Sequence, residues 1–208
     1  RSACADVAVM NGVLEWLGLE TEYVVEQFWG KRATREENRL GSKGPRELQR
    51  EGLMEAFRVL KPGGTLYLAI ENRFGLPYWL GSPDDHSGLK YNSLLPRGLA
   101  DLYSRSAIRQ SYRTYTYSAR ALRRLLGEAG FKELEFLTGF DTYGQPSTIF
   151  ALDNEFLRFY YENHQRTKLS RKGRALYRIL LHSRLAKLTV QNFLVLCRKP
   201  GGMGRASA

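Results

Sequence analysis

The chain has 208 residues, of which 43% are hydrophobic and 25% are charged. This length fits one domain, or one domain with an added lobe, and this composition excludes a collagen, a coiled coil and a disordered chain. No apolar run approaches the roughly 20 residues that span a bilayer, so the sequence predicts no transmembrane helix.

The two cysteines, Cys4 and Cys197, lie near opposite ends of the chain and lack the spacing of a metal or redox site. Two cysteines without such spacing are typical of a reducing compartment, and they exclude a disulfide scaffold. The first residues also lack the charged-then-apolar pattern of an export signal. We therefore expect a cytoplasmic protein.

The net charge of +11 is concentrated in one segment. Residues 158–187 contain nine basic residues and a single acidic one, so this segment carries a charge of +8. We expect the segment to dock on an anionic membrane surface by reversible electrostatic attraction, while Leu176, Ile179 and Leu180 pack against a β-sheet. The alternative is an ordinary solvated helix face.

The first half of the chain alternates strand, helix and strand. Residues 6–11 and 65–70 are apolar runs typical of buried strands. Between them, apolar residues at helical spacing predict a helix that begins near Pro45 and ends at the Lys-Pro-Gly-Gly turn of residues 61–64. These elements predict a right-handed βαβ unit, and the charged residues 30–44 are expected to form an exposed loop before the helix.

The second half begins with an irregular stretch rich in glycine, proline and aromatic residues, over residues 71–91. A helix over 94–103 follows, with Pro96 in its first turn, and another helix begins after Ser118 as its N-cap and ends at Gly130. The remaining predicted elements are a strand over 133–138, two helices within 154–187 and a final strand over 192–198. The pattern predicts an α/β fold.

The first strand ends at Asn11 and Gly12, a position with functional potential. In open α/β sheets, ligands bind in the crevice outside the carboxyl ends of the strands. Gly12 allows a close approach of backbone and ligand, and the Asn11 amide both donates and accepts hydrogen bonds. The alternative is a strand-to-helix turn in which Asn11 is only the cap.

Three segments resemble class I S-adenosylmethionine-dependent methyltransferases. They are DVAVMNGVLEWL, LMEAFRVLKPGGTLYLAIENR and YTYSARALRRLLGEAGF. In that family they would contain or precede the fourth, fifth and sixth strands of seven, and residues 192–198 would be the antiparallel seventh. The resemblance implies a Rossmann-like methyltransferase sheet and S-adenosylmethionine as the cofactor.

The family's glycine-rich turn, the acidic residue after its second strand and its adenine-contacting segment have no counterpart here. The resemblance therefore implies the C-terminal part of a methyltransferase, with the N-terminal strands missing, and we expect this fragment alone to be inactive. Its implied divisions are core at 1–140, a helical insertion at 141–190, the final core strand at 191–199 and a flexible tail at 200–208. The cofactor contacts that remain are Asn11, Gly12, Val13 and Leu14.

A narrower resemblance covers the segments ENRFG, GSPDDHSG and RTYTYS, between residues 71 and 118. They are similar to a bacterial methyltransferase subgroup associated with glycosyltransferases and surface-polysaccharide synthesis. This implies O-methylation of a glycan or a related metabolite. One alternative is a non-catalytic methyltransferase-like scaffold in a glycan-assembly complex. A nucleic-acid methyltransferase is disfavoured, because residues 11–14 are not the Asn/Asp-Pro-Pro-aromatic segment of enzymes that methylate base amino groups.

In this fold the loop after the fifth strand lies beside the cofactor methyl group, which supplies candidate site residues. The catalytic candidates are Glu71, Asp85 and His86, and the acceptor-binding candidates are Asn72, Arg73, Asp84 and Tyr115. A general base helps to remove the proton of a hydroxyl acceptor, and two adjacent carboxylates are expected to raise the pKa of His86 and orient its ring.

Blander interpretations of the same residues stay open. Residues 83–86 are also typical of a hydrogen-bonded turn, and Tyr115 lies in an alternation of Tyr and Thr that is typical of an extended, packed segment. Three consecutive residues rarely converge on one ion, so no metal site is predicted.

Overall fold

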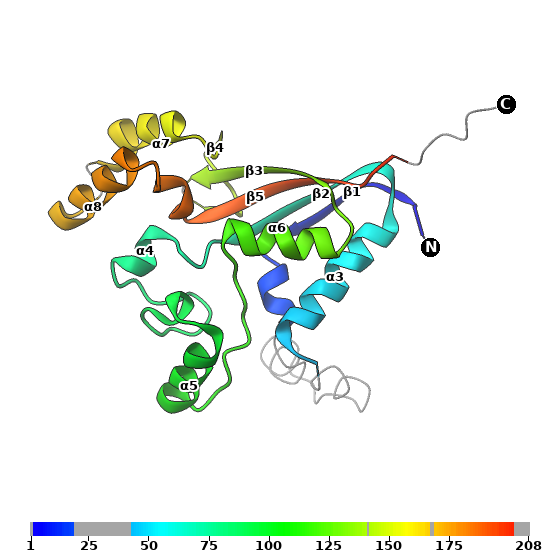
Figure 1. Cartoon of the computed structure of the whole chain (residues 1–208), viewed down its shortest axis with the longest axis horizontal. Helices are drawn as coiled ribbons and strands as arrows, with labels where there is room; N and C mark the ends of the chain where they lie inside the picture. Colours follow the sequence, from blue (N-terminus) through cyan, green and yellow to red (C-terminus); the bar gives the residue numbers. More distant parts are fainter. Residues whose placement is uncertain (1, 19–42, 141, 167–168, 202–208) are drawn as a thin grey trace.

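The computed structural model describes residues 2–18, 43–140, 142–166 and 169–201. These residues form a mixed α/β fold around a five-stranded open sheet (Figure 1), which confirms the predicted fold class. Most of the predicted loop over 30–44, and most of the predicted tail, lie outside the described residues.

The sheet has the strand order β1-β2-β5-β3-β4. Its strands are β1 (Ala5–Asn11), β2 (Leu60–Glu71), β3 (Glu133–Phe140), β4 (Thr148–Ala151) and β5 (Asn192–Arg198). Strands β1 and β2 pair in parallel, as the βαβ prediction requires. Strand β5 runs antiparallel to both of its neighbours, β2 and β3, which confirms an antiparallel final strand. Strand β4 was not predicted, and it extends the sheet beyond β3.

The five longest α-helices fall close to their predicted places, and the shorter helical elements were not among the predicted helices. The helical elements are η1 (Leu14–Gly18), α3 (Pro45–Val59), α4 (Leu76–Trp79), η2 (Asn92–Leu94), α5 (Arg97–Ile108), α6 (Ala119–Glu128), α7 (Asn154–Tyr160), the π-helical turn η3 (Tyr161–Gln165), α8 (Arg171–His182) and η4 (Ala186–Leu188). The Ser118 hydroxyl accepts from the backbone N–H of Ala121, as expected of an N-cap. Helix α5 begins three residues later than predicted, because Pro96 has extended backbone and is the N-cap.

The Lys-Pro-Gly-Gly segment forms a bulge within the long strand β2. Ala5 of β1 pairs with Leu60, and Val7 pairs with Thr65, so residues 61–64 bulge out of the ladder. Gly63 has a φ of +80°, a left-handed conformation that favours glycine. The helix thus passes directly into the strand.

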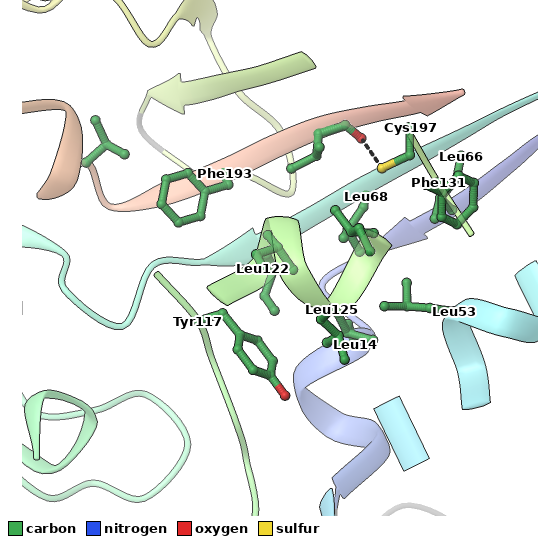
Figure 2. Close-up of a cluster of buried hydrophobic side chains, with 14 of the residues drawn as sticks. Leu14, Leu53, Leu66, Leu68, Tyr117, Leu122, Leu125, Phe131, Phe193 and Cys197 are labelled. Atoms are coloured by element: carbon green, nitrogen blue, oxygen red, sulfur yellow. Dashed lines mark hydrogen bonds between the residues drawn. The ribbon is translucent and has the colours of Figure 1, made fainter. Parts of the chain in front are cut away.

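The core lies between the sheet and helices α3 and α6, which share one face (Figure 1). Leu53 from α3 and Leu122 and Leu125 from α6 meet Leu66 and Leu68 from β2, and all five side chains are buried (Figure 2). Burial of each such side chain stabilises the fold by about 1.5–3 kcal/mol. These contacts hold α3 and α6 against strand β2.

Helices α7 and α8 lie together at one end of the molecule (Figure 1). Tyr160 stacks on Phe140 of β3, and Tyr161 stacks on Tyr177 of α8. These ring contacts attach the helical segment to the sheet and join its two helices.

Candidate functional site

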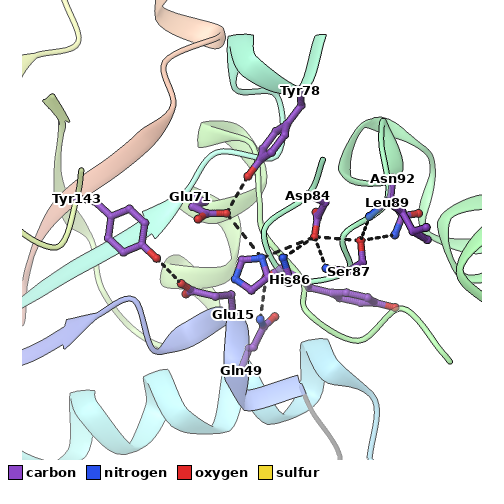
Figure 3. Close-up of polar contacts among 11 residues, drawn as sticks. Glu15, Gln49, Glu71, Tyr78, Asp84, His86, Ser87, Leu89, Asn92 and Tyr143 are labelled. Carbon is purple, nitrogen blue, oxygen red and sulfur yellow. Dashed lines mark hydrogen bonds and ion pairs between the residues drawn. The ribbon is translucent and has the colours of Figure 1, made fainter. Parts of the chain in front are cut away.

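The carboxyl ends of β1 and β2 lie at the same edge of the sheet because the two strands are parallel. Strand β1 passes through Gly12, whose N–H donates to the carbonyl of Ala69 at 3.0 Å, into η1. Strand β2 ends at Glu71. Figure 3 shows that Glu15 of η1 and Glu71 point into the same region, which the imidazole of His86 also enters.

A tight turn holds His86 in this region. The carboxylate of Asp84 accepts hydrogen bonds from the backbone N–H groups of His86, at 3.0 Å, and of Ser87, at 2.9 Å. Asp84 itself is buried, so this predicted acceptor-binding residue serves the turn. The His86 side chain is only 3% exposed, and the edge of its ring packs against Trp16, with ring centroids 4.8 Å apart.

The imidazole faces two carboxyl groups. Nδ1 of His86 lies 3.7 Å from Oε2 of Glu71 and 3.8 Å from Oδ1 of Asp84, and no described residue forms a hydrogen bond to it. Burial lowers the pKa of His86, although Asp84 and Asp85 act in the opposite direction. The expectation that adjacent carboxylates raise this pKa was therefore wrong in its net sign, because desolvation outweighs them. The imidazole is neutral at pH 7.

Two glutamates in the cluster are held in their protonated forms over an unusual pH range. Burial, followed by the charges of Asp85 and Glu15, raises the pKa of Glu71 to about 8. Burial also raises the pKa of the fully buried Glu15. Each carboxyl accepts from a tyrosine hydroxyl: Tyr78 donates to Glu71 at 2.9 Å, and Tyr143 donates to Glu15 at 3.2 Å (Figure 3). Burial thus favours the protonated form of both glutamates.

Two predicted acceptor-binding residues are used inside the fold. Asn72 is fully buried, and its amide donates to the carbonyls of Leu188 and Val190, at 2.9 and 2.8 Å. Arg73 donates to two backbone carbonyls in the turn around η2. Both side chains tie the loop after β2 to neighbouring segments, and neither joins the cluster around His86.

Tyr115 is also held by protein contacts. The guanidinium of Arg97 lies 4.0 Å from the centre of the Tyr115 ring, and the backbone carbonyl of Tyr115 accepts from the Gln49 amide at 2.9 Å. This fits the packed, extended interpretation of the Tyr–Thr alternation better than an open acceptor surface.

The predicted cofactor turn is partly covered by the β3–β4 loop. The Asn11 amide donates to the carbonyl of Gly144 at 3.4 Å, and a Cβ on Gly12 would lie 2.8 Å from the ring of Tyr143. Val13 is 42% exposed, whereas Leu14 is fully buried in the core. The Leu14 side chain is thus unavailable to a ligand, and the turn offers Asn11, Gly12 and Val13.

Three residues of the cluster were not among the predicted site residues: Glu15, Tyr78 and Tyr143. A signal for Glu15 was present, since it is a lone charge within the apolar segment Val-Leu-Glu-Trp-Leu. Tyr143 follows Glu15 by 128 positions, and nothing in its local pattern indicates the contact. Among the described residues, no group of three or more His, Cys, Asp and Glu side chains is arranged to hold a metal ion.

The fold and the site thus define an α/β protein with a buried acid–imidazole cluster at the carboxyl edge of its parallel strands. No protein-family model matches the chain, and no curated protein matches it. No helix of the described ranges is both long and apolar enough to cross a membrane.

Solved structures match the chain at low similarity. A possible exported protein from Bordetella parapertussis is 16% identical with a TM-score of 0.39, and the match covers 96% of this chain and 40% of that one. A SAM-dependent methyltransferase from Thermotoga maritima, a possible histamine N-methyltransferase, is 15% identical with a TM-score of 0.34, covering 73% and 49%.

A third match is the phosphoethanolamine N-methyltransferase 2 of Haemonchus contortus, in complex with phosphomonomethylethanolamine and S-adenosylhomocysteine. It is 15% identical with a TM-score of 0.31, and the match covers 73% of this chain and 30% of that one. The chain therefore spans less than half the length of each of these three proteins. Similarity at this level carries no functional inference, which has to come from the site.

Proposed function

We propose that the chain is part of a cytoplasmic S-adenosylmethionine-dependent methyltransferase that methylates a hydroxyl oxygen of a glycan or a related metabolite. The observation that carries the proposal is the buried imidazole of His86, which faces Glu71 and packs against Trp16 of η1, the helix that follows the turn at Asn11 and Gly12. The antiparallel β5 beside two parallel strands supports it, since the sequence resemblance implies this arrangement.

The residues of the turn fit the proposed cofactor in two respects. Gly12 has a φ of +63° and no side chain between the backbone and a ligand, and the Asn11 side chain is exposed. Asn11 and Gly12 would therefore hold S-adenosylmethionine, which supplies an electrophilic methyl group when it is bound. The ring of Tyr143 has to move away from Gly12 for the ligand to approach the backbone.

His86 is proposed as the general base. Bound S-adenosylmethionine would supply the electrophilic methyl group, and His86 would accept the proton of the acceptor hydroxyl. A neutral imidazole is the form that accepts this proton, and the lowered pKa of His86 maintains it at pH 7. The carboxyl of Glu71 lies 3.7 Å from Nδ1 and would orient the imidazole, and the charge of Asp85 contributes to the raised pKa of Glu71.

The test is methyl transfer from labelled S-adenosylmethionine to a panel of hydroxyl-bearing saccharides, with the full-length protein that contains this chain. His86→Ala is expected to lower turnover by about 10²-fold or more and to leave cofactor affinity nearly unchanged. His182→Ala, which removes an exposed histidine from α8, is the matched control. A near-normal rate for His86→Ala would reduce residues 83–86 to a structural turn.

A non-catalytic scaffold is the second candidate, and the packing of Tyr143 against Gly12 favours it. The ring fills the space beside the predicted cofactor turn. Titration calorimetry of S-adenosylmethionine separates the two candidates. We expect no micromolar binding by these 208 residues alone, and micromolar binding by the full-length protein. Absence of binding in the full-length protein as well would establish the scaffold.

A further inference from the structure

Helix α8 lies at one end of the molecule (Figure 1), and the helix and the turn after it are rich in exposed basic residues. Residues 171–188 contain no acidic side chain. Five exposed basic residues belong to this surface: Arg171, Lys172, Arg178, Arg184 and Lys187. None of the ion pairs formed by the described residues involves any of them. Arg184 and Lys187 do share a groove with Asp153, Glu155 and Glu162, so the charge with no acidic neighbour in the same segment is that of Arg171, Lys172 and Arg178.

Large aliphatic side chains are exposed among these charges. Ile179 is 64% exposed, Leu185 is 47% exposed and Leu188 is 49% exposed. Helical spacing puts Ile179 on the same side of α8 as Lys172, while the opposite stripe of the helix, which includes Tyr177, is buried. The expectation that Ile179 packs against the sheet was therefore wrong.

The outer face of α8 is held in place by contacts on its inner face. The Ser170 hydroxyl caps the helix by accepting from the N–H of Gly173 at 3.2 Å. Tyr177 stacks on Tyr161, with ring centroids 4.7 Å apart. The N–H of Leu185 donates to the carbonyl of Leu180 at 2.8 Å, which fixes the turn that carries the chain into η4. The basic and aliphatic side chains are thus presented on an anchored scaffold.

We propose that this surface, the docking strip, binds an anionic lipid bilayer. The docking strip consists of the five exposed basic residues together with Ile179, Leu185 and Leu188. Its cations match anionic headgroups, and its aliphatic side chains enter the boundary between headgroups and acyl chains. A nucleic acid would also attract the cations, but it offers no apolar phase for three exposed aliphatic side chains. The proposal is independent of methyl transfer.

The test is co-sedimentation of the chain with vesicles of phosphatidylcholine alone, or with about a third of phosphatidylglycerol, at low ionic strength. Recovery is expected only with the anionic vesicles, and it is expected to fall as salt is added. The double variant Arg171→Gln/Arg178→Gln is expected to lower the partition coefficient about 25-fold, because each engaged charge contributes about fivefold. Ile179→Ser is expected to lower it about fivefold, since an apolar contact is lost.

Matched controls remove the same groups elsewhere on the surface. Arg120→Gln/Arg124→Gln takes two exposed charges from α6, and Leu102→Ser takes a side chain that is 65% exposed from α5. Both controls are expected to retain binding within about twofold. Equal recovery with neutral and anionic vesicles would overturn the proposal. So would controls as weak as the strip variants, or binding of duplex DNA together with vesicle binding that is insensitive to Ile179→Ser.

Discussion

The raised pKa of Glu71 makes a specific prediction about stability. The carboxyl has an ordinary pKa of 4.5 in the unfolded chain and about 8 in the folded protein. Between these values the folded state binds more protons than the unfolded state, so the free energy of unfolding falls as pH rises. Each pKa unit corresponds to about 1.4 kcal/mol, so the loss between pH 6.5 and 8.5 is about 2 kcal/mol. Glu71 is 7% exposed, so solvent screening is slight.

The variant Glu71→Gln isolates this contribution. An amide has nearly the same shape as the protonated acid, and its oxygen still accepts from the Tyr78 hydroxyl. We expect the variant to lose about 2 kcal/mol less than the unaltered protein between pH 6.5 and 8.5. Glu15 contributes a slope of the same sign, which remains in the variant. His86, with its lowered pKa, contributes the opposite sign, chiefly below pH 6.5.

Urea denaturation at a series of pH values measures these free energies, and the far-ultraviolet signal reports the folded fraction. Glu133→Gln, at an exposed position of β3, is the control and is expected to follow the unaltered protein. If Glu71→Gln keeps the full pH dependence, then Glu71 ionises normally in the folded protein. The charge assignments of the cluster, and with them the proposed role of Glu71, would then be wrong.

Two further variants test the support around the site, again by urea denaturation. Gln49→Ala is expected to lower the free energy of unfolding by about 3 kcal/mol, because the buried amide donates to two carbonyls and accepts from the hydroxyl of Tyr117. Its control, Gln191→Ala at an exposed position, is expected to lower it by less than about 0.5 kcal/mol. Gly12→Ala is expected to cost at least about 1–2 kcal/mol from its left-handed backbone. Adding Tyr143→Ala to this variant removes the contact between the new Cβ and the Tyr143 ring but leaves the cost of the left-handed backbone. Full recovery of stability in the double variant would show that the backbone at position 12 is not strained.

The parts of the fold that the sequence predicts are those with local signals. The apolar runs of β1 and β2, the helical spacing of α3 and the Ser118 cap of α6 each determine their own structure. Strand β4 lacks such a signal, because it has four residues and pairs only with β3. The predicted start of α5 was three residues too early, because proline is common both in the first turn of a helix and at the position before it, and Pro96 is the N-cap.

The site was harder to predict, because its chemistry depends on burial by distant segments. The sequence shows Asp84 and Asp85 beside His86, and their charges do raise the pKa, as predicted. It does not show that Trp16, from a helix seventy positions earlier, packs against the imidazole and helps to exclude water. Desolvation outweighs the two charges, so the pKa of His86 is lowered overall. The same limit applies to Ile179, where two apolar stripes compete and packing around Tyr177 decides which one is buried.

The charge state of the cluster separates a catalytic role from a structural one. The carboxylate of Asp84 stabilises the turn by accepting from two backbone N–H groups and from the Ser87 hydroxyl. None of these hydrogen bonds involves the imidazole. Nδ1 of His86 has no hydrogen-bond partner among the described residues, and burying such an atom costs free energy that the turn does not require. A general base needs a nitrogen without a proton, and Nδ1 is buried against Glu71 and Asp84, so a hydroxyl acceptor would reach it only after this packing opens. The proposed proton transfer therefore requires a movement of the turn at residues 83–86 or of Glu71, and His86→Ala tests it.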